Sequence, residues 1–423
     1  LDNTNFTLTP IFYTHYCIAL SADHPLAAKD KLSYQDLHNQ KIISKGRSFR
    51  CFRDNMEKYI LGNGLAYGYK PDNIKRDDLS WEKNQMINAG IDLQMFDGYI
   101  GFSVDYYNTN TSNMLLYVPV PLLTGYSTSL QNLGKVNNRG WELALTSQHT
   151  FANGFGYSFN ANYAKNTNEV KELGPGNAPI ISSGSVGHAY YITEVGKPIG
   201  NYYLLVQDGI FATEEDLKKY PHFDNTEVGD FRFVDVDGDG KLDLDKDRTI
   251  CGNYMPKFTY GFGGKLWYAG FDMDFNFQGV YGNKILNLNK RYLDNMEGNT
   301  NGTKIALDRW KSPENPGSGS VNKANRKQTG YNSRTSTWHL ESGSYLRLQN
   351  LSLGYTLPRA LTQKFKVEKM RVYVSGQNLF TITDYSGYNP EVNARPSKNL
   401  TPGEDYGTYP LARTYMFGLN LTL

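Results

Sequence analysis

The last eleven residues of the chain, RTYMFGLNLTL (413–423), constrain its fold more than any other segment. In an extended strand, successive side chains point to opposite faces. One face of this segment is then wholly apolar and the other is mostly small or polar: Tyr415, Phe417, Leu419, Leu421 and Leu423 against Thr414, Met416, Gly418, Asn420 and Thr422. A terminal strand of this kind is what a transmembrane β-barrel needs, with lipid outside and a wet lumen inside.

The same alternation recurs along the chain and is clearest in FDMDFNFQ (271–278), where four large apolar side chains alternate with four polar ones. In a barrel the polar set faces the lumen, where it either contacts a glycan or peptide substrate or is simply solvated. These candidate lumen residues are Asp272, Asp274, Asn276 and Gln278. In YLRLQNLSLGYTL (345–357) the apolar phase shifts by one residue, which predicts a β-bulge near Gln349 and Asn350.

Short turns and long loops alternate between these strands. Turns are predicted at 96–98 and 268–270, whereas the other connections are long and rich in Asn, Gly and Ser. Roughly ten strands with this pattern of connections are typical of outer-membrane barrels. The predicted fold class is therefore all-β, an antiparallel transmembrane β-barrel. The alternative is a soluble β-sandwich or β-helix with aromatic-rich strands.

Composition excludes several other classes. The chain has 423 residues, 14% of them aromatic, and a mean hydropathy of −0.55, with no apolar run near the ~18 residues of a spanning helix. The net charge of +2 gives no field that would favour nucleic acid as a partner. The three cysteines, Cys17, Cys51 and Cys251, suggest neither a disulfide framework nor a zinc site. The opening LDNTNFTLTP is no signal peptide, so we expect the export signal to be encoded upstream or to be missing.

The first 57 residues read differently from the rest of the chain. They contain two successive strand–turn–helix patterns, which predict a small α/β piece. Further on, the segment TEEDLKKY (213–220) is the one other place that suggests a helix, with Thr213 as its N-cap. The predicted domains are therefore 1–57 and 58–423.

One loop resembles a calcium-binding loop. In DVDGDGKLDLDKD (235–247), carboxylates occupy the first, third, fifth and ninth positions of an EF-hand-like spacing: Asp235, Asp237, Asp239 and Asp243. Lys246 stands at the twelfth position, where a bidentate Glu normally closes the shell. Weak Ca²⁺ binding and an acidic surface turn held by side-chain-to-backbone hydrogen bonds both remain open.

Catalysis has no support in this sequence. The seven His residues are scattered, there is no HExxH motif, and the Cys residues have no partner arrangement. The Gly-rich stretch GFGG (261–264) lies inside an alternating strand, which favours close packing over phosphate binding. We therefore expect no enzyme, no catalytic residue and no required cofactor.

Eight motifs in order resemble the C-terminal half of SusC/RagA-type TonB-dependent outer-membrane transporters. The clearest are NLGKVNNRGWEL (132–143), GKPIGNYYLLVQDGIF (196–211), the segment 233–263 and VYVSGQNLFTITDYSGYNPEVN (372–393). The resemblance covers residues 59–423. It implies a 22-stranded barrel with an N-terminal plug, in the outer membrane of a Gram-negative cell. It also implies import of oligosaccharides or peptides, with a SusD-like surface lipoprotein and the TonB complex as partners.

This resemblance implies an incomplete barrel, because roughly ten strands supply less than half of the 22. Unpaired strand edges in lipid cost several kcal/mol for each unsatisfied backbone group, so the chain alone should not transport. Residues 12–57 resemble the effector-binding domain of LysR-type regulators, which suggests a chimera. Two other functions stay open: a soluble LysR-like ligand-binding module, and a secreted Ca²⁺-dependent glycan-binding β-protein.

Overall fold

A computed structural model describes residues 79–119, 128–132, 134–186, 188–327 and 331–423. The predicted α/β piece in residues 1–57 lies outside these described residues. Among the residues described, no helix is both long and apolar enough to span a membrane.

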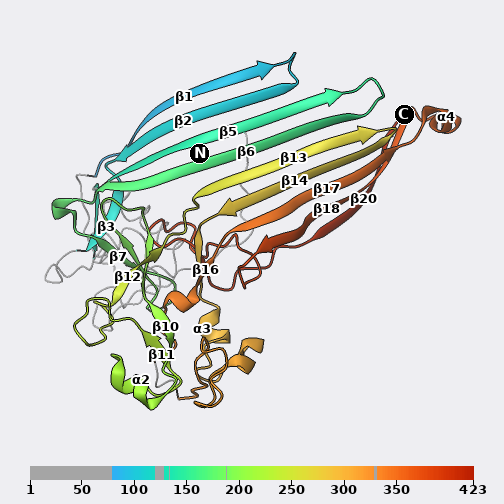
Figure 1. Cartoon of the computed structure of the whole chain (residues 1–423). Coiled ribbons are helices and arrows are strands. Elements are labelled where there is room, and N and C mark those ends of the chain that lie inside the picture. The colour runs from blue at the N-terminus through green and yellow to red at the C-terminus, as the bar shows by residue number, and fades with distance from the viewer. Residues whose placement is uncertain (1–78, 120–127, 133, 187, 328–330) are drawn as a thin grey trace, which may run out of the picture. The chain divides into compact units, whose positions relative to one another are not determined.

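Nine long antiparallel strands form the principal sheet (Figure 1). In spatial order they are β1 (Lys83–Met95), β2 (Ile100–Ser112), β5 (Lys135–Thr150), β6 (Gly156–Glu172), β13 (Phe258–Tyr268), β14 (Phe271–Tyr281), β17 (Tyr345–Thr356), β18 (Lys369–Thr383) and β20 (Thr414–Thr422). The spatial order follows the chain order, which is the up-and-down topology expected of a barrel wall. Strands β1 and β20 are the two edges of this sheet, so it is an arc of a barrel.

Tight turns join the strands at one end of the sheet. Phe96 and Asp97 both take positive φ, of 56° and 55°, between β1 and β2, and Ala269 and Gly270 do so between β13 and β14. Both turns lie where the sequence predicted them. At this same end, α4 (Arg359–Thr362) and the 3₁₀ helix η6 (Gln363–Phe365) connect β17 to β18.

The predicted β-bulge is confirmed in β17. Asn276 of β14 faces Asn350 and Phe277 faces Leu348, so Gln349 has no partner in β14. The extra residue shifts the pleat by one position. Leu346 and Leu348 can therefore be followed by Leu351 and Leu353 without a break in the strand.

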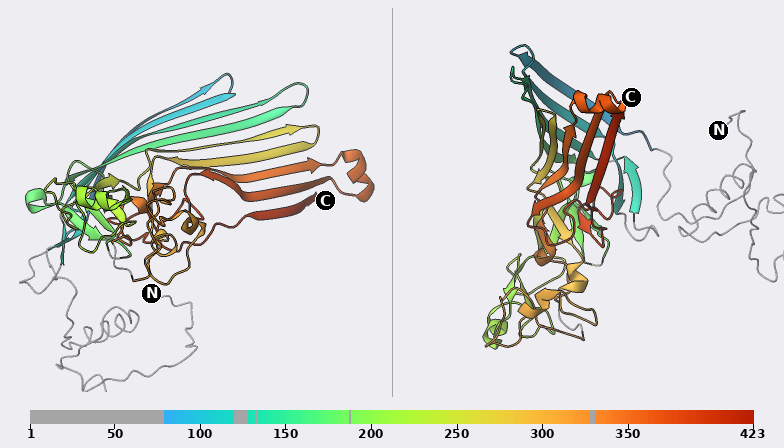
Figure 2. Two further views of the ribbon diagram at one scale, coloured as in Figure 1. Left: turned by 60° about the horizontal axis from the view of Figure 1, so that its bottom comes forward. Right: turned by 90° about the vertical axis from the view of Figure 1, so that its right-hand side faces the viewer.

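Shorter elements gather at the opposite end of the long strands (Figures 1 and 2). The strands are β3 (Leu115–Pro119), β4 (Thr128–Asn132), β7 (Ile180–Ser183), β8 (Tyr190–Thr193), β9 (Asn201–Leu205), β10 (Gln207–Ile210), β11 (Phe231–Phe233), β12 (Arg248–Gly252), β15 (Lys284–Asn287), β16 (Leu340–Ser342) and β19 (Glu404–Asp405). The helices are α2 (Glu214–Lys219), α3 (Lys290–Leu293), η3 (Pro175–Asn177), η4 (Lys304–Asp308) and η5 (Thr337–His339). Helix α2 begins as predicted, because Thr213 Oγ1 accepts from the Asp216 amide, and the Asp216 carboxylate accepts from the Thr213 amide.

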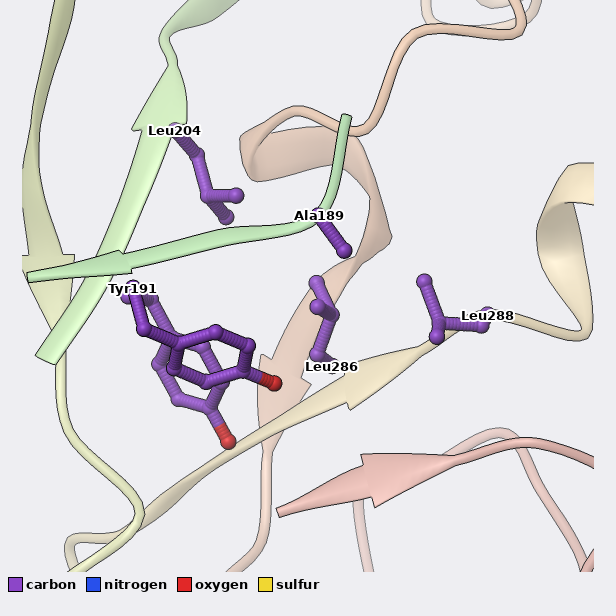
Figure 3. Packing of buried hydrophobic residues seen from close by; sticks show 6 residues of the cluster. Ala189, Tyr191, Leu204, Leu286 and Leu288 are labelled. Atoms are coloured by element: carbon purple, nitrogen blue, oxygen red, sulfur yellow. The ribbon is translucent and has the colours of Figure 1, made fainter. Parts of the chain in front are cut away.

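The main apolar core lies among these short elements and not on a face of the long sheet. One cluster joins β8, β9 and the segment of β15 through Ala189, Tyr191, Tyr202, Leu204, Leu286 and Leu288 (Figure 3). The rings of Tyr191 and Tyr202 lie 5.2 Å apart, and the Tyr202 hydroxyl donates to the carbonyls of Lys284 and Gly403. A second cluster holds β10 and β11 through Leu205, Ile210, Phe223, Phe231 and Phe233. These short elements and the loops that join them therefore form a packed body with its own core, which we call the loop body.

Candidate functional site

The long sheet carries one continuous apolar face. Strand register places Leu93, Phe102 and Leu145 side by side on β1, β2 and β5. Further along, Leu266, Met273, Leu353, Val374 and Phe417 form a row across β13, β14, β17, β18 and β20. Many side chains on this face are exposed: Phe417 of β20 is 83% exposed, and Phe271 at the start of β14 is 64% exposed. A soluble protein rarely exposes such a large apolar surface, so this face needs an apolar environment.

Aromatic rings cross the apolar face at the short-turn end. Tyr99 contacts His149 and His149 contacts Phe151, each with ring centroids 4.5 Å apart. Phe155 continues the line to Tyr268 at 6.4 Å, and Phe271 meets Tyr355 at 4.5 Å. We call these seven residues the short-turn belt.

A second aromatic line crosses the same face towards the long loops. Tyr106 and Trp141 lie 4.8 Å apart, and Phe258 lies 5.3 Å from Tyr163 and 4.9 Å from Tyr281. We call these five residues the long-loop belt. Aromatic girdles at both edges of an apolar band are characteristic of outer-membrane barrels.

The separation of the two belts fits a bilayer. Strand β14 runs from Phe271 in one belt to Tyr281 in the other and is 11 residues long. At a rise of ~3.4 Å per residue it spans roughly 34 Å along the strand. A tilt of about 40° reduces this to roughly 26 Å, close to the ~25 Å apolar band of transmembrane barrels.

The four candidate lumen residues lie together on the opposite, polar face of β14. Asp272 is not free there, because Arg371 of β18 reaches across β17 to bind it in a bidentate ion pair. The Asp272 carboxylate oxygens accept from Arg371 Nε at 2.9 Å and Nη2 at 2.5 Å. Gly354 makes this possible, since a Cβ at that position would clash with the guanidinium. The pair therefore ties three strands together on the polar face.

The other three candidate residues differ in what they contact. Gln278 donates to Tyr345 Oη and to Glu391 Oε1, both at 3.4 Å. Asp274 and Asn276 have no side-chain hydrogen bond or ion pair with another described residue, although Lys265 lies opposite Asp274 in the ladder. Asp274 and Asn276 are therefore the members of the set that remain available to a solute.

The polar face also holds a buried arginine that the sequence did not single out. Arg347 is 4% exposed and ion-pairs with Glu391, while its Nη2 donates to Asn389 Oδ1 at 2.8 Å. The Tyr345 hydroxyl donates to the same carboxylate at 2.5 Å. This network fastens the segment after β18 to the polar face of β17.

A buried carboxylate that the sequence also did not single out joins distant parts of the loop body. Glu404 of β19 is fully buried and accepts from the Ser185 amide at 3.0 Å, from the Ser185 hydroxyl and from the Tyr191 hydroxyl at 3.1 Å. Burial raises the pKa of Tyr191, which therefore stays a hydroxyl donor. These bonds connect β19 to the loop before β8. Sequence spacing gives no signal for them, because the partners are more than 200 residues apart.

The acidic loop brings three of its four predicted ligands together. One oxygen from each of Asp235, Asp237 and Asp239 lies within 4.8 Å of the others, in an exposed loop between β11 and β12. The loop's own backbone already uses these carboxylates: Asp235 accepts from the amides of Gly238 at 2.7 Å and Gly240 at 2.8 Å. These bonds hold the pKa of Asp235 below its ordinary value.

Asp243 is not a member of this three-carboxylate group. Its Oδ1 accepts from the amides of Asp245 and Lys246, and these bonds lower its pKa. Lys246 stands at the position where a calcium-binding loop normally has its last carboxylate ligand, and its ammonium lies 3.9 Å from Asp239. Asp247 is fully buried and closes the loop by accepting from the amides of Val236 and Asp243.

Comparison with known proteins identifies the class. Residues 44–379 match the family of TonB-dependent receptor-like β-barrels, and the chain belongs to that family. TonB-dependent receptor P3 of Formosa agariphila is 34% identical over 375 residues, which cover 86% of this chain and 36% of that receptor. TonB-dependent receptor SusC of Bacteroides thetaiotaomicron is 27% identical over 351 residues, or 82% of this chain and 32% of that receptor.

Solved structures agree with this assignment. The RagAB peptide transporter superposes with a TM-score of 0.64 at 27% identity, covering 81% of this chain and 36% of that one. The open-open state of the RagAB peptide importer gives 0.66 at 25% identity, covering 83% and 36%. The predicted SusC/RagA resemblance and the β-barrel fold are confirmed. The aligned residues span about a third of the length of these relatives.

The LysR-type resemblance of residues 12–57 finds no support. The family match begins at residue 44, inside that segment. A short strand, a polar turn and a helix start occur in many α/β proteins, so this pattern carries little specificity.

Proposed function

We propose that this chain forms part of the wall of an outer-membrane importer. The nine strands line the passage with their polar face and contact lipid with their apolar face. The observation that carries this proposal is the continuous apolar face bounded by two aromatic belts roughly 26 Å apart. A soluble β-sandwich would instead cover such a face with a second sheet.

The transported solute is an oligosaccharide or a peptide in this proposal. The polar face offers carboxamides, hydroxyls and single charges, and Asp274 and Asn276 stand on it without side-chain partners among the described residues. Such groups exchange hydrogen bonds with amides and sugar hydroxyls equally well. The TonB complex supplies the energy and a SusD-like surface lipoprotein acts as partner, both by family resemblance.

A barrel with two open edges is not stable in lipid, so the transporting unit contains further strands that complete the wall. Strands β1 and β20 are the edges at which those strands pair. The acidic loop on the long-loop side binds Ca²⁺ weakly in this proposal, with Asp235, Asp237 and Asp239 as the ligands. Import does not depend on that ion.

An uptake measurement tests the proposal. Asp274→Ala/Asn276→Ala changes only the polar face, and Phe275→Leu, which changes the apolar face at the same height, is the control. With each variant placed in the complete transporter, uptake of fluorescent oligosaccharide and peptide libraries should fall in the first variant and stay near wild type in the control. Both proteins should reach the outer membrane. Uptake that persists without the TonB complex, or a protein that stays in the aqueous fraction, would overturn the proposal.

A further inference from the structure

The apolar face ends abruptly just beyond the long-loop belt, on β5 and β6. Along β5, the residues on this face read Leu145, Leu143 and Trp141, and the next in the series is Arg139. Along β6 the corresponding step is from Tyr163 to Lys165. Two cations therefore follow the belt directly, on the outward face of the sheet.

These two cations are close neighbours. Trp141 lies opposite Lys165 in the ladder, and Arg139 lies opposite Thr167, so Arg139 and Lys165 are diagonal partners on one face. Diagonal pairs of this kind have Cα atoms roughly 7–8 Å apart, within reach of one anionic group for side chains of this length.

Cations outnumber acids around this pair on the outward face. Arg139 and Lys165 are exposed, and neither forms an ion pair or a side-chain hydrogen bond with another residue that the structure describes. The next acid on that face of β6, Glu169, lies 2.7 Å from Lys171 and also attracts Arg139, so two cations share it. Three cations, Arg139, Lys165 and Lys171, therefore share one carboxylate, and the excess positive charge on this face favours an anion from outside the chain.

The height of the pair on the sheet identifies the anion. On the proposed function, the long-loop belt marks the outer boundary of the hydrocarbon, and groups one residue further lie at the level of lipid headgroups. We propose that Arg139 and Lys165 form a binding site for the phosphate of an anionic lipid headgroup in the outer leaflet. Trp141 packs beneath it at the boundary of the acyl chains. A phosphate monoester carries a charge of about −1.5 to −2, which suits two cations.

Native mass spectrometry of the intact protein in zwitterionic detergent tests this site, with doubly phosphorylated lipid A as the probe. Arg139→Gln/Lys165→Gln should weaken binding about thirtyfold, a factor of roughly five for each cation near a charged lipid surface. Lys265→Gln/Lys369→Gln removes the same charge from the polar face and should change binding less than about twofold. Raising the salt concentration should reduce the difference between wild type and the first variant.

Two further arms separate the possible sources of the anion. Dephosphorylated lipid A should bind like the Arg139→Gln/Lys165→Gln variant, and millimolar inorganic phosphate should not displace the lipid. Equal binding by the two double variants, equal binding of the dephosphorylated lipid, or displacement by free phosphate would each overturn the inference. If the protein inserts into vesicles but shows no headgroup preference, this inference alone fails. If it does not insert, the proposed function fails with it.

Discussion

Two adjacent residues at mid-height of the sheet should tolerate a positive charge very differently. Leu351 lies on the apolar face, opposite Phe275 and Gly376, and Ser352 lies on the polar face, opposite Asp274 and Ser375. Phe275 is close to the middle of β14 between the two belts. Leu351→Arg therefore places a guanidinium near the bilayer midplane, whereas Ser352→Arg places it beside a carboxylate in the wet lumen.

The magnitudes differ sharply between the two variants. An arginine at the midplane of the lipid-facing surface of a barrel costs about 2–4 kcal/mol. At about 3 kcal/mol, Leu351→Arg lowers the folding equilibrium constant roughly 150-fold. Ser352→Arg gains a neighbour of opposite charge in Asp274, so its expected change is within about 1 kcal/mol of zero.

Urea titration of the complete barrel that contains this sheet, folded in phosphocholine vesicles, measures both values. Tryptophan fluorescence follows the transition, and thin vesicles keep the folding reversible. The refuting result is a cost for Ser352→Arg equal to or larger than that of Leu351→Arg. That outcome would mean that the Ser352 face is the one buried in an apolar medium.

Three further predictions concern the polar face and the loops. Arg371→Ala leaves the Asp272 carboxylate without its partner and should destabilise the protein by about 2 kcal/mol. A double-mutant cycle with Asp272→Ala should show a coupling free energy that favours the native pair. Burial lowers the pKa of His339 to about 3, so the unfolded chain binds more protons below pH 6.5. The loop body should then lose about 1.4 kcal/mol of stability per pH unit as the pH falls from 6.5 towards 3, and His339→Phe should remove that slope in hydrogen exchange. Asp235→Ala/Asp239→Ala should abolish any calorimetric heat of Ca²⁺ binding at millimolar concentration, and an unchanged titration would reduce the loop to a surface turn.

Local patterns in the sequence predicted the parts of the fold that depend on local physics. The alternation in 271–278 and 413–423 defines strand faces, because the pleat forces successive side chains apart. The one-residue phase shift near Gln349 required a bulge, since a strand cannot otherwise change its apolar face. The N-cap at Thr213 is equally local, as the hydroxyl and the amide it accepts from are three residues apart.

The polar contacts that fasten the sheet and the loops could not be predicted in the same way. Asp272 and Arg371 are 99 residues apart, and their meeting depends on β17 lying between their strands with glycine at position 354. A period-2 pattern places both on the polar face but does not say which residues become neighbours. Arg371 could still have been singled out, because it stands at an inward position among the valines of β18.

The acidic loop shows where a spacing rule is incomplete. The spacing of Asp235, Asp237 and Asp239 correctly predicted their convergence. It also suggested Asp243 as a ligand, but the fold uses that carboxylate to cap the next turn. Asp247 instead faces inward and accepts two backbone amides, a role that only burial reveals.

In the proposed arrangement this sheet is a membrane wall with lipid on one face and water on the other. This arrangement can be tested by spin-label power saturation along β14, with single cysteines introduced from Phe271 to Tyr281 in the complete barrel embedded in vesicles. We expect high access to oxygen dissolved in lipid at Phe271, Met273, Phe275 and Phe277. Access to a water-soluble nickel complex should peak at the alternate positions. Equal access to both reagents along the strand, or the opposite phase, would mean that this sheet does not separate lipid from water in the proposed way.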